Sequence, residues 1–578
     1  MSASSGERRS ACRRQNRSLW IFLLLLPTTC LFGRSAETGT YVFVADQSKV
    51  VQTGGIAHVQ WTYSVEGQFQ LAIDANAGTA SFVRVDANAT DDSPFKRTLD
   101  PNHVFNMTSL VGTVVDSTNL SFSGKASDGS DILITVSLAD NVAHLIGQTT
   151  PPPNSADFFI FSLDAVAQRK YGGGSGTADD PYQIATAADL IALGHSPEDY
   201  DKHFILTADI DLDPNLPGGK VFDEAVVAPD TDPTSWDFQR TSFTGVFDGN
   251  GHKMWNFTYD SNDTYNIGFF GYIDHGNAQV KNLSLIDPSI DAGTASSVGP
   301  LAGRLIEGSI SGCHVLGGTV SGGSCVGGLV GYIDWGTVTQ CSSTASVTGS
   351  STVGGLAGKN YGGSIVSSCS TGSVTGESSV GGFVGSNMAF ADIVNCYATG
   401  DVTGDRNVAG IAGHNSCRGV LGTIRNCYSV GRVTGTEYVG GIVGWNCGAV
   451  ESSFWNTETS GINEPNYGEG RTTAQMHHPD TFRAAGWDFI GESENGTEDI
   501  WAICEGVGYP HLAWEFVIGD FDADADTDFA DFCILAEHWL AADGSFWCGA
   551  GGTDLTNDGN VDSADLDELA DNWLAGVE

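Results

Sequence analysis

Two acidic stretches near the C-terminal end have the residue types and the spacing of a cation-binding loop. The first, GDFDADADTDFAD, places a carboxylate at every second position from Asp520 to Asp528 and another at Asp531. Counted from Asp520, these carboxylates hold positions 1, 3, 5, 7, 9 and 12, the spacing at which a calcium-binding loop wraps its oxygen ligands around Ca²⁺. Ionised carboxylates this close repel one another, and a bound divalent cation would reverse that cost.

The same pattern recurs from Asp554, with Gly559 at loop position 6, where the chain must turn sharply. Ala525 holds that position in the first loop, so we expect the first loop to bind Ca²⁺ more weakly. Two matching stretches predict two Ca²⁺ sites, over residues 520–531 and 554–565. The predicted metal ligands are Asp520, Asp522, Asp524, Asp526, Asp528, Asp531, Asp554, Thr556, Asp558, Asn560, Asp562 and Asp565.

Each loop leads into an apolar, helix-like run, DFCILAEHWL after the first and DLDELADNWL after the second. Residues 519–575 therefore resemble a type I dockerin, in which a calcium loop and its following helix occur twice. The resemblance implies a helical calcium module that attaches the chain to a cohesin-like scaffold or a cell-surface partner. Dockerins carry hydroxyl residues at loop positions 10 and 11, whereas this chain has Phe529-Ala530 and Ser563-Ala564, which leaves an anchor of another kind open.

A small core is expected between the two helices of this module. The apolar residues expected to form it are Phe532, Leu535, Trp539, Leu566, Leu569 and Trp573. A segment this short buries little apolar surface, so we expect metal binding to provide much of its stability.

Other residues that could do chemistry have simpler interpretations. Asp209, Asp211 and Asp213 in ADIDLD share one side of a strand, and alternation favours a polar outer face over a cation site. Asp248 and His252 in FDGNGH fit a turn that needs Asp and Asn better than a catalytic pair. His477-His478 has no other residue at metal-ligand spacing, and the sequence lacks G-x-S-x-G, H-E-x-x-H, C-x-x-C and the phosphate-binding loop. The catalytic residues of any activity stay unassigned.

The middle of the chain is built from an internal repeat. One register reads VGPLAG, VGGLVG, VGGLAG, VGGFVG, VAGIAG and VGGIVG, beginning at Val298 and ending with the copy at Val439. A second register ends in Cys and a third reads VSG or VTG, and all three advance along the chain with nearly the same period. Three short β segments per period predict one coil of a parallel β-helix, in which equivalent residues of successive coils stack about 4.8 Å apart. We attribute the corner glycines to a need for positive φ.

Stacking of the coils predicts three ladders of side chains. The internal cysteine ladder is expected to stay reduced and consists of Cys313, Cys341, Cys369, Cys396 and Cys427. The internal amide ladder consists of Asn360, Asn387, Asn415 and Asn446. The exposed ladder consists of Arg304, Tyr332, Lys359, Ser386, His414 and Trp445, which are either solvent-facing turn residues or, with Trp335, a surface on which sugar rings stack.

The repeat, with NCYSVGRVTG between copies, resembles the GLUG motif of bacterial surface and secreted proteins. FTGVFDGNGHKMWNF before the repeats, and SSFWNTETSG and GEGRTTAQM after them, are similar to the flanks of such chains. The resemblance covers residues 177–515, including a short helical passage TAADLIALG, and implies an architecture without implying catalytic residues.

The remaining segments complete a mainly β organisation. Residues 1–36, an arginine-rich stretch followed by LWIFLLLL, are predicted to be a signal peptide, so the mature protein is expected to be secreted. Residues 37–168 alternate apolar and polar side chains between turns, which predicts an antiparallel β-sandwich or barrel. Residues 169–176 are expected to form a Gly-rich linker before the β-helix.

Charge and composition bound the function. The formal net charge of −44 disfavours nucleic acid as a partner, and no later segment is apolar enough to span a membrane. The first hypothesis is a secreted, non-catalytic adhesion or binding protein linked to extracellular polysaccharide. The alternative is a polysaccharide lyase or glycoside hydrolase on a β-helix, which needs two carboxylates in one groove. Carboxylates are scarce within the repeats, at positions such as Asp334, Glu377 and Asp405, which favours binding.

Overall fold

The computed structural model describes the strands between residues 39 and 169, most of residues 171–515, and two C-terminal segments, 529–540 and 561–571 without residue 538. Between 171 and 515 the gaps are 217–218, 231–240, 262–264, 417–421, 464–466, 491–493, 504–505 and 507. The predicted signal peptide and loop residues 520–528 and 554–560 lie outside the described residues. The chain divides into two compact units, Met1–Gln168 and Arg169–Glu578.

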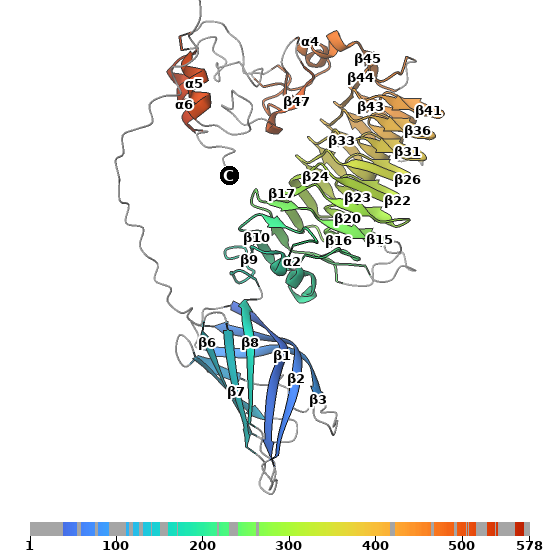
Figure 1. Ribbon diagram of the computed structural model, residues 1–578. Coiled ribbons are helices and arrows are strands. Elements are labelled where there is room, and N and C mark those ends of the chain that lie inside the picture. Colours follow the sequence, from blue (N-terminus) through green and yellow to red (C-terminus); the bar gives the residue numbers. More distant parts are fainter. Residues whose placement is uncertain are drawn as a thin grey trace, which may run out of the picture. The chain divides into compact units, whose positions relative to one another are not determined.

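The first unit is an antiparallel sheet that closes into a barrel, with each strand paired to the next in chain order (Figure 1). Of the two architectures left open by the sequence, the strands adopt the barrel. The strands are β1 Gly39–Gly54, β2 Val59–Asp74, β3 Thr79–Asp91, β4 Val111–Val114, β5 Asn119–Lys125, β6 Asp131–Ala139, β7 Val142–Thr150 and β8 Ile160–Arg169.

The second unit is dominated by a stack of coils in which three parallel sheets run along one axis (Figure 1). The first solenoid sheet contains β9 Tyr182–Ile184, β10 His203–Leu206, β11 Ile210–Asp211, β12 Val246–Asp248, β13 Lys253–Trp255, β17 Gln279–Ile286, β21 Ser309–Leu316, β24 Thr337–Thr339, β25 Ser342–Ser343, β28 Ser364–Val366, β29 Cys369–Ser370, β33 Asp392–Val394, β34 Tyr397–Ala398, β38 Thr423–Arg425, β39 Tyr428–Ser429, β43 Ala449–Glu451, β44 Phe454–Asn456 and β45 Glu469–Arg471.

The other two sheets contain the strands that flank the GLUG-like glycines. The second solenoid sheet contains β14 Thr258–Asp260, β15 Tyr265–Ile267, β18 Ser289–Asp291, β19 Ser296–Val298, β22 Thr319–Gly327, β26 Ser346–Gly354, β30 Val374–Thr375, β31 Ser378–Gly381, β35 Val402–Thr403, β36 Arg406–Ala409, β40 Val433–Thr434 and β41 Glu437–Gly440. The third solenoid sheet contains β16 Phe270–Asp274, β20 Ala302–Ile306, β23 Val330–Asp334, β27 Ala357–Tyr361, β32 Val384–Met388, β37 Ala412–Asn415 and β42 Val443–Asn446. Its seven strands mark seven coils, so the predicted parallel β-helix is confirmed.

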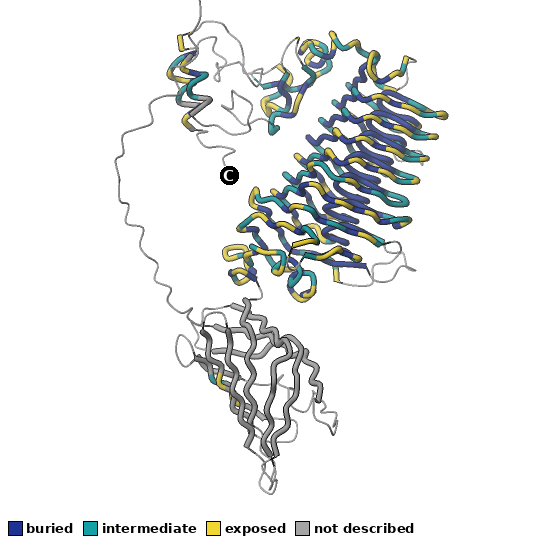
Figure 2. The backbone as a smooth tube through the Cα atoms, viewed as in Figure 1, coloured by how far each residue is buried: buried dark blue, intermediate teal, exposed yellow. Residues whose placement is uncertain are grey.

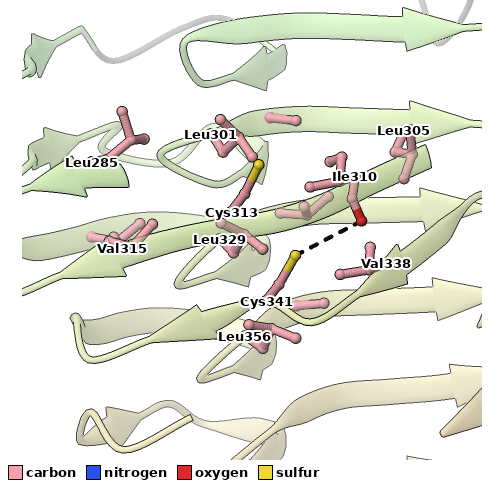
Figure 3. Packing of buried hydrophobic residues seen from close by; sticks show 14 of the residues in the cluster. Leu285, Leu301, Leu305, Ile310, Cys313, Val315, Leu329, Val338, Cys341 and Leu356 are labelled. Atoms are coloured by element: carbon pink, nitrogen blue, oxygen red, sulfur yellow. Dashed lines mark hydrogen bonds between the residues drawn. The ribbon is translucent and has the colours of Figure 1, made fainter. Parts of the chain in front are cut away.

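The core runs along the inside of the solenoid, and Figure 2 shows the buried residues, in dark blue, recurring from coil to coil. The fourth residue of each GLUG-like copy is fully buried, and Figure 3 shows three of these leucines one above another. These residues are Leu301, Leu329, Leu356, Phe383, Ile411 and Ile442. Because one inward position repeats once per coil, the repeat in the sequence becomes a continuous apolar column.

The motif glycines serve close approach of the backbone, not positive φ. A Cβ on Gly328 would lie 2.1 Å from the carbonyl oxygen of Gly355 in the next coil, and Gly328 is not among the residues with positive φ. The need for positive φ that the sequence indicated applies to glycines at corners outside the motif, such as Gly317, Gly318 and Gly362. Beside the motif, the left-handed backbone falls one residue before each motif valine or its equivalent, at Asn266, Ser297, Cys325, Thr352, Ser379, Asn407 and Tyr438, with φ between 53° and 61°.

The cysteine ladder holds at four of the five predicted positions. Cys313, Cys341, Cys396 and Cys427 are buried and reduced, and Cys341 Sγ donates to the carbonyl of Ile310 at 3.8 Å (Figure 3). Burial raises the pKa of the Cys341 thiol to about 12, so the thiol stays protonated and unreactive.

Cys369 does not belong to this ladder, because it pairs with Ser342 and Tyr397, one residue out of register. Ser368 holds the ladder position instead, and its hydroxyl accepts from the amide of Cys341 at 3.1 Å. A shift of one residue along a strand turns a side chain to the opposite face. Cys369 therefore points outward, under the C-terminal segment.

Short helices lie before the first coils and after the last one. α2 Ala187–Gly194, predicted from TAADLIALG, begins with a capping box between Thr186 and Asp189 and buries Leu190 and Leu193. It is followed by η1 Pro197–Asp199. The elements after the last coil are α3 Thr473–Met476, α4 Pro479–Arg483, β46 Trp501–Ala502, β47 His511–Leu512 and η2 Ala513–Glu515. None of the helices in the described part of the chain is long and apolar enough to cross a membrane.

Candidate binding surface and calcium module

The outward side of the third solenoid sheet carries the ladder that the sequence predicted to be exposed. Of its six predicted members Trp445 is exposed, Ser386 is buried and the other four are partly buried. Strand register stacks each member directly on the next: Arg304 on Tyr332, Tyr332 on Lys359, Lys359 on Ser386, Ser386 on His414 and His414 on Trp445. Tyr272 extends the ladder by one coil, because it pairs with Arg304. The inward position after each ladder residue holds Ile or Leu in the first three coils and Asn in the next four, whereas the outward side chains differ more widely from coil to coil.

Cations and aromatic rings alternate in the first half of this ladder. The Arg304 guanidinium lies 4.7 Å from the centre of the Tyr332 ring, and Lys359 Nζ lies 4.7 Å from the same ring. Lys359 Nζ also lies 5.4 Å from the ring of Tyr361, which follows it on β27. Such contacts hold a cation by the negative face of the ring and keep long side chains in place.

Arg304 is neutralised locally by Asp334, whose carboxylate accepts from its guanidinium at 2.7 Å. Asp334 ends strand β23 and lies two residues after Tyr332, on the same side of the sheet. Burial tends to lower the pKa of Arg304, and the hydrogen bond to Asp334 outweighs it, so the net pKa is raised. Asp334 is therefore engaged in an ion pair within the sheet.

The amide ladder is present and its hydrogen bonds run in one direction. Asn360 Nδ2 donates to Asn387 at 3.0 Å, Asn387 to Asn415 at 3.0 Å and Asn415 to Asn446 at 2.9 Å. The same amide nitrogens also donate to the carbonyls of the turns beside them, such as that of Ala391 at 3.0 Å. The role of these residues is structural, because the first three are fully buried.

The other sequence candidates belong to turns. Asp209 accepts from the amide of Lys253 at 2.9 Å and contacts His252 at 3.1 Å, whereas Asp211 accepts from the amide of Asp213. Asp248 accepts from the amide of Asn250 at 2.9 Å. Although burial alone would raise the pKa of Asp248, hydrogen bonds from Asn250, Lys281 and Asn282 lower it.

The histidine pair after the repeats is also structural. His478 caps α4, and His477 packs edge-on against the ring of Tyr509 at 4.6 Å. Among the described residues, no group of three His, Cys, Asp or Glu side chains is arranged to hold a metal ion.

A partly buried carboxylate that the sequence did not reveal, Glu515, lies where the C-terminal segment covers the first solenoid sheet. Glu515 accepts from Tyr397 Oη at 2.5 Å and from the amide of Leu512 at 2.7 Å, and Cys369 Sγ donates to it at 3.2 Å. Burial alone would raise the pKa of Glu515, but hydrogen bonds from His511, Tyr397 and Leu512 outweigh it, so the pKa is lowered. The adjacent Trp514 donates to the carbonyl of Ser367 at 2.8 Å and stacks on His314.

The described part of the predicted calcium module consists of two helices with matching bounds. α5 Phe529–Glu537 begins at position 10 of the first acidic loop, and α6 Ser563–Asp571 begins at position 10 of the second. Leu535, Val561 and Leu569 are fully buried, with Phe532 and Leu566 packed against them. Trp539, expected in this core, is 41% exposed, and Val561 was missed because it lies inside the loop rather than on a helix.

Of the second acidic loop, residues 561–565 fall within the part of the chain that the structure describes. Asp565 is fully buried in the first turn of α6, and its carboxylate accepts from the amide of Asp562 at 2.8 Å. The side chain of Asp562 accepts from the amide of Ala564 at 2.9 Å. Asp565 holds loop position 12, where a Ca²⁺ loop has its closing ligand, and the bond from the Asp562 amide makes it a cap on the first turn of α6 as well. Predicted ligand Asp531 lies on α5.

The comparisons with known proteins agree with the repeat. The family model described as "The GLUG motif" matches residues 322–348 and 376–403. Halomucin from Haloquadratum walsbyi is 32% identical over 176 residues, which cover 30% of this chain and 2% of halomucin. A protein described as a putative Gly-rich membrane protein, from Evansella cellulosilytica, is 37% identical over 137 residues, 23% of this chain and 14% of that protein.

The matched regions are therefore small parts of these relatives. Among solved structures, an IgA1 protease matches 65% of this chain and 29% of its own chain, at 16% identity and a TM-score of 0.36. The matched motif segments begin within β22 and just before β31, and each spans one coil of the solenoid. The parallel β-solenoid of this chain is thus built from coils that carry the GLUG motif.

Proposed function

We propose that this chain is a secreted, non-catalytic binding or adhesion protein whose solenoid is a rigid rod that presents one face to its ligand. The observation that carries the proposal is the third solenoid sheet, where inward positions repeat and outward positions vary from Tyr and Arg to Ser, His and Trp. Stacked repeats of this kind form extended binding surfaces, because the core sustains the rod while the outer residues are free to differ.

The comparisons support a location at the cell surface or outside the cell. One relative is described as a putative Gly-rich membrane protein and the other is named halomucin. The predicted signal peptide over residues 1–36 points the same way.

The C-terminal module would be the attachment point. Two Ca²⁺ ions held by the loops at 520–531 and 554–565 would order α5 and α6 and present them to a cohesin-like or cell-surface partner. The matching helix bounds and the buried Asp565 support this assignment.

Glycan binding and polysaccharide degradation, measured on the same secreted full-length protein, test the proposal. We expect retention on one or more polysaccharides of a glycan array and no time-dependent release of reducing ends or unsaturated sugars. Product that accumulates in proportion to protein concentration would favour the lyase or hydrolase alternative instead.

A further inference from the structure

One corner of the third solenoid sheet holds an exposed tryptophan in a costly backbone conformation. Trp335 follows β23 directly, is 53% exposed and has φ of 63°, a region that bulky residues rarely adopt. Gly362 holds a similar place after β27, with φ of 65°. Glycine adopts this conformation at no steric cost, so the fold itself does not require Trp at this corner.

The ring of Trp335 is held in place without being buried. It lies over Gly362, where a Cβ would come within 2.8 Å of three ring atoms, so the absence of a side chain there makes room for it. It also meets the ring of Tyr361 edge-on, with centres 6.4 Å apart and planes at 85°. A ring fixed before binding loses little freedom when a ligand stacks on it.

A cation lies beside the same aromatic group. Tyr361 contacts both Trp335 and Lys359, whose Nζ lies close to the rings of both Tyr332 and Tyr361. Asp334, the acidic residue on the adjoining strand, is paired with Arg304, and Lys359 forms no ion pair among the described residues. A cation without an ion-pair partner, next to an exposed ring, is locally complementary to the carboxylate of an acidic sugar. The net charge of −44 opposes acidic polymers at long range, so this local contact would have to provide the attraction.

We propose that Trp335, Tyr361 and Lys359 form a binding site for a polysaccharide that contains uronic acids, with a pyranose ring stacked on Trp335 and a sugar carboxylate at Lys359. Successive coils lie about 4.8 Å apart, similar to the advance per sugar in an extended chain, so the polysaccharide would run along the solenoid axis. This assignment rests on the proposed binding function and names its ligand class.

Affinity electrophoresis and calorimetry with polygalacturonate and alginate, against hydroxyethyl cellulose as the neutral polymer, test the site on the full-length protein. Trp335→Ala should weaken binding to the uronate polymers about tenfold, and Lys359→Gln about three- to tenfold. Raised salt screens both the Lys359 contact and the repulsion between the acidic chain and the acidic polymer, so the difference in affinity between the unaltered protein and Lys359→Gln should shrink as salt rises. Trp255→Ala, which removes an exposed ring from β13 on another sheet, is the matched control and should bind as before.

The possible outcomes distinguish a failure of the Trp335 site from a failure of the proposed binding function. Uronate binding that survives both Trp335→Ala and Lys359→Gln would overturn the site while leaving the binding function in place. Binding of the neutral polymer with equal strength would overturn the ligand class. A protein that binds no polysaccharide but attaches to cells would overturn the site, whereas release of products would overturn the non-catalytic function.

Discussion

At the scale of single residues, the solenoid uses side-chain amides where its coils turn. Asn387 illustrates the arrangement, since its Nδ2 donates to Ala391 and Asn415 and its Oδ1 accepts from Asn360. At the first rung the neighbour in register is Ile333, and Asn360 Oδ1 has no hydrogen-bond donor among the described residues. The ladder therefore has one unsatisfied end, and its interior rungs hold two neighbours each.

Replacing an interior rung should cost more than replacing the terminal one. Asn387→Leu would remove the acceptor of the Asn360 amide and the donor to the Asn415 carbonyl oxygen, and we expect a loss of about 2 to 4 kcal/mol in the free energy of unfolding. Asn446→Leu, at the partly exposed end, is the control and should cost less than half as much. Urea unfolding followed by circular dichroism measures both, and equal losses would contradict a buried, directional ladder.

At the scale of elements, the segment from α3 to η2 folds back over the first solenoid sheet and covers an aromatic face. Tyr397, Tyr428 and Phe454, which stack in register, pack there against Phe482, Trp487 and Trp501. Glu515 closes this contact with hydrogen bonds to Tyr397 and Cys369, and it directly precedes the chain leading to the calcium module. Force applied at the module would therefore reach the side of the solenoid at the Glu515 contact before it reaches the last coil.

Acid should loosen this contact. The folded-state pKa of Glu515 lies below its ordinary value of 4.5, so its stabilising contribution is present above pH 4.5 and is lost as the pH falls through the lowered value. Burial lowers the pKa of His314, which stacks on Trp514, below its ordinary value of 6.5. A loss of stability that begins near pH 6.5 would therefore come from His314 instead of Glu515.

Hydrogen exchange of residues 501–515, measured from pH 7 to pH 3, would show the acid step. Glu515→Gln should exchange faster at neutral pH and lack the step below pH 4.5. A variant that keeps the step would show that another group causes it. Glu498→Gln, an exposed carboxylate shortly before this segment, is the matched control.

At the scale of the whole molecule, the solenoid and the two C-terminal helices are stabilised in different ways. The solenoid is held by a continuous core and by ladders that need no ligand, whereas α5 and α6 share only a small core around Leu535, Val561 and Leu569. We therefore expect the rod to persist under conditions in which the calcium module unfolds.

Calcium titration of the full-length protein should reveal two sites of unequal affinity. Asp565→Asn should weaken the tighter site and Asp531→Asn the weaker one, each by about tenfold or more, because loop position 12 closes the loop onto the ion. Chelation should remove the helical signal and expose the C-terminal module to proteolysis while residues 171–515 stay intact. Asp179 is an exposed carboxylate outside the module, and Asp179→Asn should bind Ca²⁺ as the unaltered protein does. An identical cleavage pattern with chelator and with millimolar Ca²⁺ would contradict the assignment.

The sequence alone determined the features that involve only contacts between neighbouring coils or residues within a single loop. The short, regular period of the repeat determined the parallel solenoid, the amide ladder and the outward ladder of the third sheet, because each coil contacts only the coils beside it. The acidic spacing led to the calcium prediction for the same reason, since a calcium-binding loop contains its own ligands.

The tertiary structure was needed for the contacts between residues that are distant in the sequence and for the choice of partners among adjacent side chains. Tyr397 and Glu515 are far apart in the sequence, and no local pattern indicates that the C-terminal segment buries this pair. The place of Cys369 depended on a one-residue register shift that the recurring Cys of the repeat concealed. Asp334 pairs with Arg304, and Lys359 forms no ion pair with any residue that the structure describes. This pairing required the side chains themselves, because stacking fixes which residues are adjacent but not which of them bind each other.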